Sequence, residues 1–173
     1  MTLQNLRVQT RLLIAFGLVL ALSTLSGGLS VVKLAGIESN LEDVVLDNNV
    51  KIRLNYAMAE SVHTVTRVMR TIVLLKDKEQ MKTENDKLLK ARAEYDKAWT
   101  ALDKMPASDA GKAARAKLAA VRAQARPIND KVLELDATGK EEEAVAVLLK
   151  EANPANDKWQ AAIGENIALQ EAA

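Results

Sequence analysis

The sequence predicts an all-α protein, an up-down-up-down antiparallel four-helix bundle whose first helix is continuous with an N-terminal transmembrane helix. Three observations predict this fold. The strong helix formers Ala, Leu, Glu and Lys dominate the 173 residues. In four long segments the apolar residues recur at a spacing close to that of helices packed at shallow crossing angles. Gly and Pro number only seven and three, too few for a fold with many turns.

The composition also excludes several classes of function. The chain has no Cys, which rules out disulfides, thiol nucleophiles and thiolate zinc sites. His63 is the single His, so multi-His metal sites and ferritin-like di-iron sites are excluded. A net charge of +1 and an aromatic content of 3% argue against nucleic-acid binding. No nucleophile–base pair or Gly-rich phosphate loop stands out, so we expect neither an enzyme nor a cofactor.

Residues 12–32 form an uncharged apolar stretch of 21 residues. At about 1.5 Å per residue it spans roughly 32 Å, enough to cross the hydrocarbon core of a bilayer. Arg7 and Arg11 precede it, so we expect residues 1–11 to be a cytoplasmic leader, with the chain after Lys33 outside. A cleaved signal peptide is the alternative, but its apolar region usually has about 7–15 residues. The stretch therefore predicts an uncleaved transmembrane signal anchor.

The first two helices of the bundle are expected at about 33–75 and 78–105. The first has no Pro or Gly after Gly36, and Asp77 is a plausible N-cap of the second. The inward positions expected on the first helix are Leu34, Ile37, Leu41, Val44, Asn48, Ile52, Asn55, Met58, Val62, Val65, Met69 and Ile72. On the second they are Met81, Leu88, Tyr95, Trp99 and Leu102.

The last two helices are expected at about 109–137 and 141–173. Ser108 is the expected N-cap of the third helix, and Gly139 suits the position just after its end. We expect Pro127 to bend the third helix or loosen one turn, and Asn153-Pro154 to kink the fourth. The connections are short, so sequential helices should be antiparallel neighbours. The helical pattern still continues at Ala173, which we interpret as the front part of a longer receptor rather than a complete small membrane protein.

These features together resemble the N-terminal sensor region of bacterial methyl-accepting chemotaxis proteins, in particular the four-helix-bundle ligand-binding class. The local matches are the leader 5–12 (NLRVQTRL), the segment 67–75 (RVMRTIVLL), and Asp130-Lys131-Val132-Leu133 followed by Gly139-Lys140. The resemblance implies a signal anchor in the inner membrane and a periplasmic sensor domain over residues 33–173. Histidine kinases and cyclases can carry the same sensor, so the output stays open.

Candidate binding residues lie on one face of the first helix. His63, Arg67 and Arg70 are spaced i, i+4 and i+7, with Thr64 and Thr71 beside them. Two permanently charged guanidinium groups offer forked donors to a carboxylate. The resemblance implies a ligand at this membrane-distal position, whereas a solvated charged face is the alternative.

Other positions supply supporting candidates and a predicted dimer contact. An arginine of the third helix, Arg126, or one from a partner subunit is expected to support the site. Tyr95 could offer its hydroxyl group, although it should mainly fill the core. Asn48 and Asn55 at inward positions suggest a homodimer packed through the first helix, because buried Asn fixes register in helix pairs. We therefore expect a sensor for a small carboxylate; a membrane-anchored scaffold without a ligand is the alternative.

The topology can be tested directly. A reporter that is active only in the cytoplasm, fused after Ala173 of this chain, should be silent because the bundle is expected outside. An active reporter at that position would contradict the orientation inferred from Arg7 and Arg11.

Overall fold

The structure, a computed structural model, describes residues 16–17, 19–20, 23–24 and 47–172. The chain divides into two compact units, 1–44 and 45–173. The predicted leader, most of the predicted signal anchor and residues 33–46 of the first helix lie outside the described residues. Among the residues that are described, no helix is both long enough and apolar enough to span a membrane.

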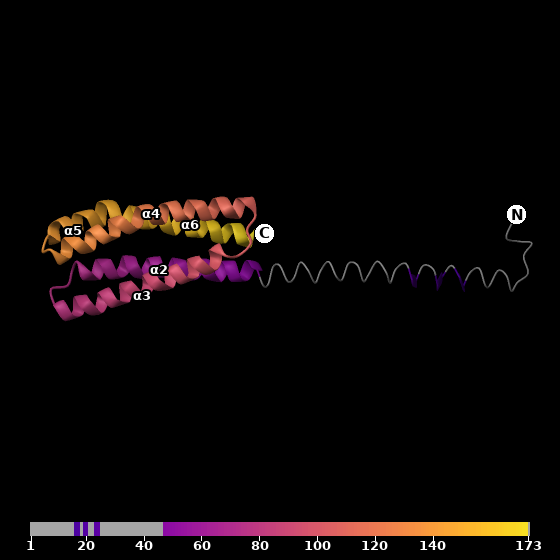
Figure 1. Cartoon of the computed structure of the whole chain (residues 1–173), viewed down its shortest axis with the longest axis horizontal. Helices are drawn as coiled ribbons and strands as arrows, with labels where there is room; N and C mark the ends of the chain where they lie inside the picture. The colour runs from indigo at the N-terminus through magenta and orange to yellow at the C-terminus, as the bar shows by residue number, and fades with distance from the viewer. Residues whose placement is uncertain (1–15, 18, 21–22, 25–46, 173) are drawn as a thin grey trace, which may run out of the picture. The chain divides into compact units, whose positions relative to one another are not determined.

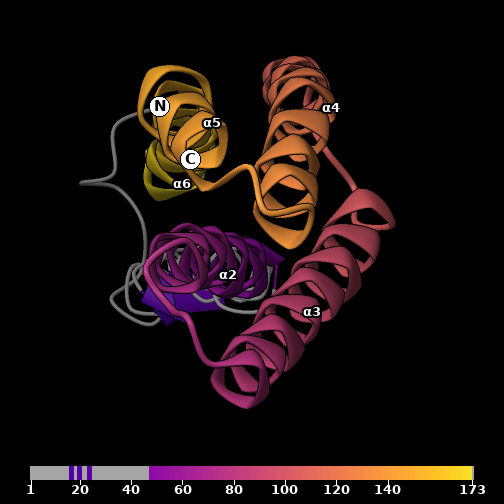
Figure 2. The same cartoon turned by 90° about the vertical axis from the view of Figure 1, so that its left-hand side faces the viewer.

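Over its described residues the second unit consists of helices joined by short turns, with no strand, which confirms the all-α four-helix bundle. Its elements are α2 (Asn49–Ile72), α3 (Lys78–Asp103), α4 (Asp109–Ala137), α5 (Glu141–Val147), the π-helix η3 (Leu148–Ala152) and α6 (Asn153–Glu171). The α2–α3 and α4–α5 turns meet at one end of the bundle, here called the tip. The C-terminus and the α3–α4 connection lie at the other end (Figure 1). Viewed along its length, the bundle has α2, α3, α4 and α5 with α6 around a common core (Figure 2).

The predicted helix ends are confirmed by their capping contacts. The Asp77 carboxylate accepts a hydrogen bond from the Gln80 N–H at 2.8 Å. The Ser108 hydroxyl accepts one from the Gly111 N–H at 3.2 Å. These contacts satisfy N–H groups that have no partner within the first turn of a helix. After α4, Gly139 has a φ of +78°, the left-handed conformation that favours glycine at a helix end.

The fourth predicted helix, 141–173, is not a single α-helix. Pro154 has no N–H, and its ring would clash with the carbonyl of Lys150 in a regular α-helix. The chain widens into η3 just before this proline, where the Asn153 N–H bonds to the Leu148 carbonyl instead. The predicted kink is thus realised as a π-helical segment. The loosened turn expected at Pro127 is absent, because α4 is α-helical throughout its length.

The core of the bundle consists of two apolar clusters that follow each other along its axis. The cluster nearer the tip includes Val65 and Met69 of α2, Leu88 of α3 and Val132 of α4. The other includes Met58, Val62, Tyr95, Leu102, Leu118, Trp159 and Ile163. Most of the predicted inward residues within the described part are buried, as the helical spacing required.

A pair of buried asparagines separates the two clusters. Along the chain, each asparagine lies between buried residues of one cluster and buried residues of the other. Asn129 of α4 and Asn156 of α6 are each 1% exposed. Asn129 Nδ2 donates to Asn156 Oδ1 at 3.0 Å, and Asn156 Nδ2 donates to Asn129 Oδ1 at 3.1 Å. Because each amide satisfies the other, the pair allows α4 and α6 to meet in one register only.

The α3–α4 edge of the bundle is held mainly by charged side chains. The two backbones do not approach each other as closely as those of the other neighbouring helices. Arg92 pairs with Asp130 at 2.6 Å, while Arg122 and Arg126 both reach Asp96 Oδ1, at 2.6 and 2.5 Å. The long arginine side chains therefore bridge the wider gap between α3 and α4.

The asparagine pair should couple energetically. Replacement of either Asn129 or Asn156 by Ala leaves a buried amide without its partner, which we expect to cost about 1–3 kcal/mol of unfolding free energy. The double variant should lose less than the sum of the two single losses, because no orphaned amide remains. Chemical denaturation of the two single variants, the double variant and the exposed control Asn49→Ala would measure this. Additive losses would contradict the pairing.

Candidate ligand-binding site

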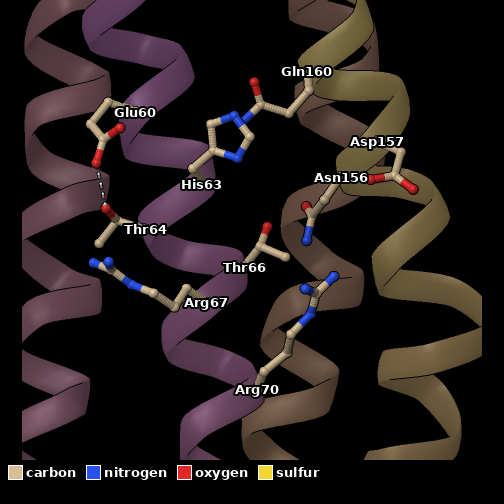
Figure 3. A pocket seen from close by; sticks show the side chains of 9 residues that line it. All are labelled: Glu60, His63, Thr64, Thr66, Arg67, Arg70, Asn156, Asp157 and Gln160. Carbon is tan, nitrogen blue, oxygen red and sulfur yellow. Dashed lines mark hydrogen bonds between the residues drawn. The ribbon is translucent and has the colours of Figure 1, made fainter.

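A cavity of about 470 Å³ lies between α2 and α6 (Figure 3). It is lined by Glu60, His63, Thr64, Thr66, Arg67, Arg70, Asn156, Asp157 and Gln160. Two hydrogen bonds connect α2 with α6, one accepted by Asn153 and one donated by Gln160. Arg70 Nη2 donates to Asn153 Oδ1 at 3.1 Å, and Gln160 Nε2 donates to the Ala59 carbonyl at 2.8 Å.

Four of the predicted binding residues line this cavity together: His63, Thr64, Arg67 and Arg70. They do so because positions separated by three or four residues lie on one face of a helix. On α2 the neighbouring face, with Val62, Val65 and Met69, is buried in the core. The polar face is consequently held at a fixed position beside α6.

The two arginines of the cavity have no acidic partner among the described residues. Arg67 makes no side-chain hydrogen bond or ion pair there, and Arg70 bonds only to the neutral amide of Asn153. Figure 3 shows Arg70 and His63 on the α6 side of α2, with Arg67 turned toward Thr64. An anion shared by both arginines would thus require the flexible side chain of Arg67 to rotate.

Two carboxylates that were not among the predicted binding residues also line the cavity. Glu60 accepts a hydrogen bond from the Thr64 hydroxyl at 3.4 Å, and Asp157 makes no side-chain hydrogen bond or ion pair with the described residues. The lining therefore carries two cationic and two anionic groups. Glu60 lies one helical turn before Thr64 on α2, whereas Asp157 is 87 residues beyond Arg70 in the sequence. Only the antiparallel packing of α6 against α2 brings it there.

Three other predicted site residues lie away from this cavity. Thr71 lines a separate groove between α2 and α3, with its hydroxyl donating to the Arg67 carbonyl at 3.1 Å. Arg126 pairs with Asp96 on the α3–α4 edge. Its guanidinium lies 5.7 Å from the centre of the Tyr95 ring.

Tyr95 belongs to the core. It is 1% exposed, and its ring meets that of Trp159 edge to face, with centroids 4.9 Å apart. Its hydroxyl oxygen accepts a hydrogen bond from Trp159 Nε1 at 3.0 Å. Burial raises the pKa of Tyr95 to about 12, although this hydrogen bond and the nearby arginines oppose the shift. The phenol group therefore remains neutral and serves packing.

Comparison with known proteins agrees with this architecture. Residues 5–173 match the family described as "four helix bundle sensory module for signal transduction". The chain belongs to this family, whose members are sensory modules rather than catalytic domains. No protein of curated function matches the chain in sequence.

A solved structure shares the fold. It is described as the periplasmic sensor domain of a sensor histidine kinase and superimposes with a TM-score of 0.63 at 16% sequence identity. The match covers 75% of this chain and 89% of that domain. At this level of identity the likeness concerns the fold alone.

Proposed function

We propose that this chain is the ligand-sensing region of a transmembrane chemoreceptor and that it binds a small carboxylate in the cavity between α2 and α6. The observation that carries the proposal is the presence of two arginines, Arg67 and Arg70, without acidic partners among the described residues. Guanidinium charge is permanent, and two such groups within one helical turn repel each other. An anion that binds both relieves this repulsion and gains charge-assisted hydrogen bonds.

The charges of the cavity favour an amino acid over a simple organic acid. An α-amino acid carries a carboxylate for Arg67 and Arg70 and an ammonium group for Asp157 or Glu60. A dicarboxylate would satisfy the arginines but would leave its other end facing these carboxylates. His63, Thr64 and Asn156 offer neutral hydrogen bonds to the remainder of the ligand.

Binding at this site would act on the contact between the first and last helices of the bundle. Arg70 holds Asn153, the first residue of α6, directly after the π-helical segment. A ligand that recruits Arg70 competes with this bond and ties α2 to α6 through its own contacts. Such a ligand favours one of two packings of α6 against α2, and a small helix displacement follows.

The expected cellular setting follows from the predicted anchor in residues 12–32 and from the family. The bundle would lie in the periplasm, with the anchor in the inner membrane and the helix displacement passed across it. A sensor region of a histidine kinase or a cyclase is the second candidate, favoured by the fold shared with a histidine kinase sensor domain. A scaffold without a ligand would leave the unpaired arginines unexplained.

The ligand site can be tested by calorimetry on the full chain, purified in a mild detergent and titrated with amino acids and with their deaminated analogues. Loss of one charge-assisted interaction costs about 1.5–3 kcal/mol. We therefore expect Arg67→Ala and Arg70→Ala to weaken binding of a selected ligand by about 10- to 150-fold each. Arg53→Ala, which removes an exposed arginine of α2 outside the cavity, is the matched control and should bind normally.

Asp157→Asn separates the two ligand classes. It should weaken the binding of an amino acid but not that of the organic acid with the same carbon skeleton. If both arginine variants hold the ligand as tightly as the wild type, the site lies elsewhere. Because Arg67 has no partner, its removal should change the unfolding free energy by less than about 0.5 kcal/mol, so lost binding would not reflect unfolding.

We further propose a homodimer packed through the first helix. Asn55, one of the residues that suggested it, is fully buried within one chain, where its Nδ2 donates to the Lys51 carbonyl at 2.8 Å. The exposed side chains of Val50 and Tyr56 on α2 support the homodimer more strongly than Asn55 does, because they are available for contact with a second chain. Cysteine introduced at Ile37 or Leu41 should cross-link two chains under mild oxidation. Absence of cross-links at any position tested along the whole first helix would rule the dimer out.

A further inference from the structure

A second cavity, of about 440 Å³, lies at the tip, where the α2–α3 and α4–α5 turns meet. Its apolar wall includes Leu75 and Met81, and its polar wall includes Asp136 and Glu141. This cavity is separate from the one between α2 and α6, with which it shares no lining residue.

Asp136 is the unusual residue of the tip cavity. It is 8% exposed, one of three buried charged side chains in the described part of the chain, with Lys51 and Arg115. Lys51 pairs with Asp47, and Arg115 Nη1 donates to the Met105 carbonyl at 2.7 Å. Asp136 has no such contact: its Oδ2 is buried, and its carboxylate makes no hydrogen bond or ion pair with the described residues.

The surroundings of Asp136 disfavour its negative charge in three ways. Burial removes water from the carboxylate and is the largest cause of a pKa raised above the ordinary value. The charge of Glu141 raises the pKa further, while Lys76 opposes the shift. Asp136 also lies in the last turn of α4, where the helix dipole disfavours a negative charge. Lys76 compensates only in part, because it pairs with Glu141.

We propose that the tip cavity binds the ammonium group of a small alkylamine, with the ammonium between Asp136 and Glu141 and the alkyl chain against Leu75 and Met81. A cationic donor supplies the hydrogen bonds that the Asp136 carboxylate lacks. The apolar wall suits an alkyl chain better than the water shell of a metal ion. Among the described residues, no group of three or more metal-ligating side chains is present. The bound amine would displace Lys76 from Glu141 and join the two turns of the tip.

Thermal unfolding of the full chain with butylammonium chloride tests this site. Tm should rise in a saturable manner, by about 3–6 °C at ten times Kd, relative to the same concentration of NaCl. Asp136→Asn should abolish the shift, whereas Asp86→Asn, which removes an exposed carboxylate of α3, should retain it. Glu141→Gln should weaken the amine at least threefold. A shift that persists in Asp136→Asn, or an unchanged affinity in Glu141→Gln, would overturn the proposal.

Two further ligands distinguish the alternatives. Butanol, with the same alkyl chain and no charge, should give no saturable shift, and an equal shift would show that apolar contact alone suffices. Magnesium chloride should also give no Tm shift larger than that of NaCl at the same ionic strength. A magnesium-dependent shift that is lost in Asp136→Asn would show a metal site instead and would refute the amine assignment.

The pH dependence of stability gives an independent measurement on the amine-free protein. Because the pKa of Asp136 is raised on folding, the folded chain binds this proton more readily than the unfolded chain. Wild-type stability should therefore fall, relative to Asp136→Asn, as the pH rises from the ordinary aspartate pKa through the raised one. The groups that face Asp136, namely Glu141, Lys76 and Lys78, are the same in both proteins. A difference that does not vary with pH would mean that the carboxylate is already compensated, and the proposal would fail.

Discussion

The reciprocal amide pair of Asn129 and Asn156 is the constraint on which the arrangement of this bundle depends. Apolar side chains alone tolerate sliding of one helix along another, because one leucine packs against another at several registers. Two buried amides that satisfy each other do not, since displacement by one turn would leave both without partners in an apolar core. The pair thereby fixes the position of α6, and with α6 that of every cavity residue contributed by it. Asn156 both belongs to this pair and lines the cavity, so the residue that fixes the register of the core also shapes the cavity wall.

The break between α5 and α6 adds a second property to the same helix. A π-helical segment has poorer hydrogen-bond geometry than an α-helix, and such segments occur often at functional sites. In this chain it directly precedes Asn153, the residue held by Arg70. The last helix, α6, is thus held in its first turn by Asn156, while the π-helical segment just before its start can change conformation more easily.

The sequence was sufficient for the helices and for four of the nine residues that line the cavity, for identifiable reasons. Capping residues such as Asp77 and Ser108 act over three positions, so their role is visible locally. The polar face with His63, Thr64, Arg67 and Arg70 follows from helical spacing alone. Asp157 and Gln160 could not be assigned, because their proximity to α2 depends on how two distant helices pair. For a related reason, the local pattern of Arg126 did not reveal that it would pair with Asp96 of the neighbouring helix, away from the cavity. The extent of the break before Pro154 was also hidden, since a kink and a π-helical segment have the same sequence signal.

The charged α3–α4 edge determines where the bundle opens locally. The α2–α3 and α4–α6 pairs are joined by close backbone packing, whereas α3 and α4 meet through partly hydrated ion pairs. Salt weakens such pairs and leaves the apolar contacts of the other seams nearly unchanged. Transient opening of the bundle therefore begins along the α3–α4 edge, while the contact between α2 and α6 on the opposite side stays closed. Amide protons of α3 and α4 that face the gap between these helices would exchange with solvent before those that face α2 and α6. The cavity lies at the contact between α2 and α6, so it keeps its geometry while the opposite α3–α4 edge fluctuates.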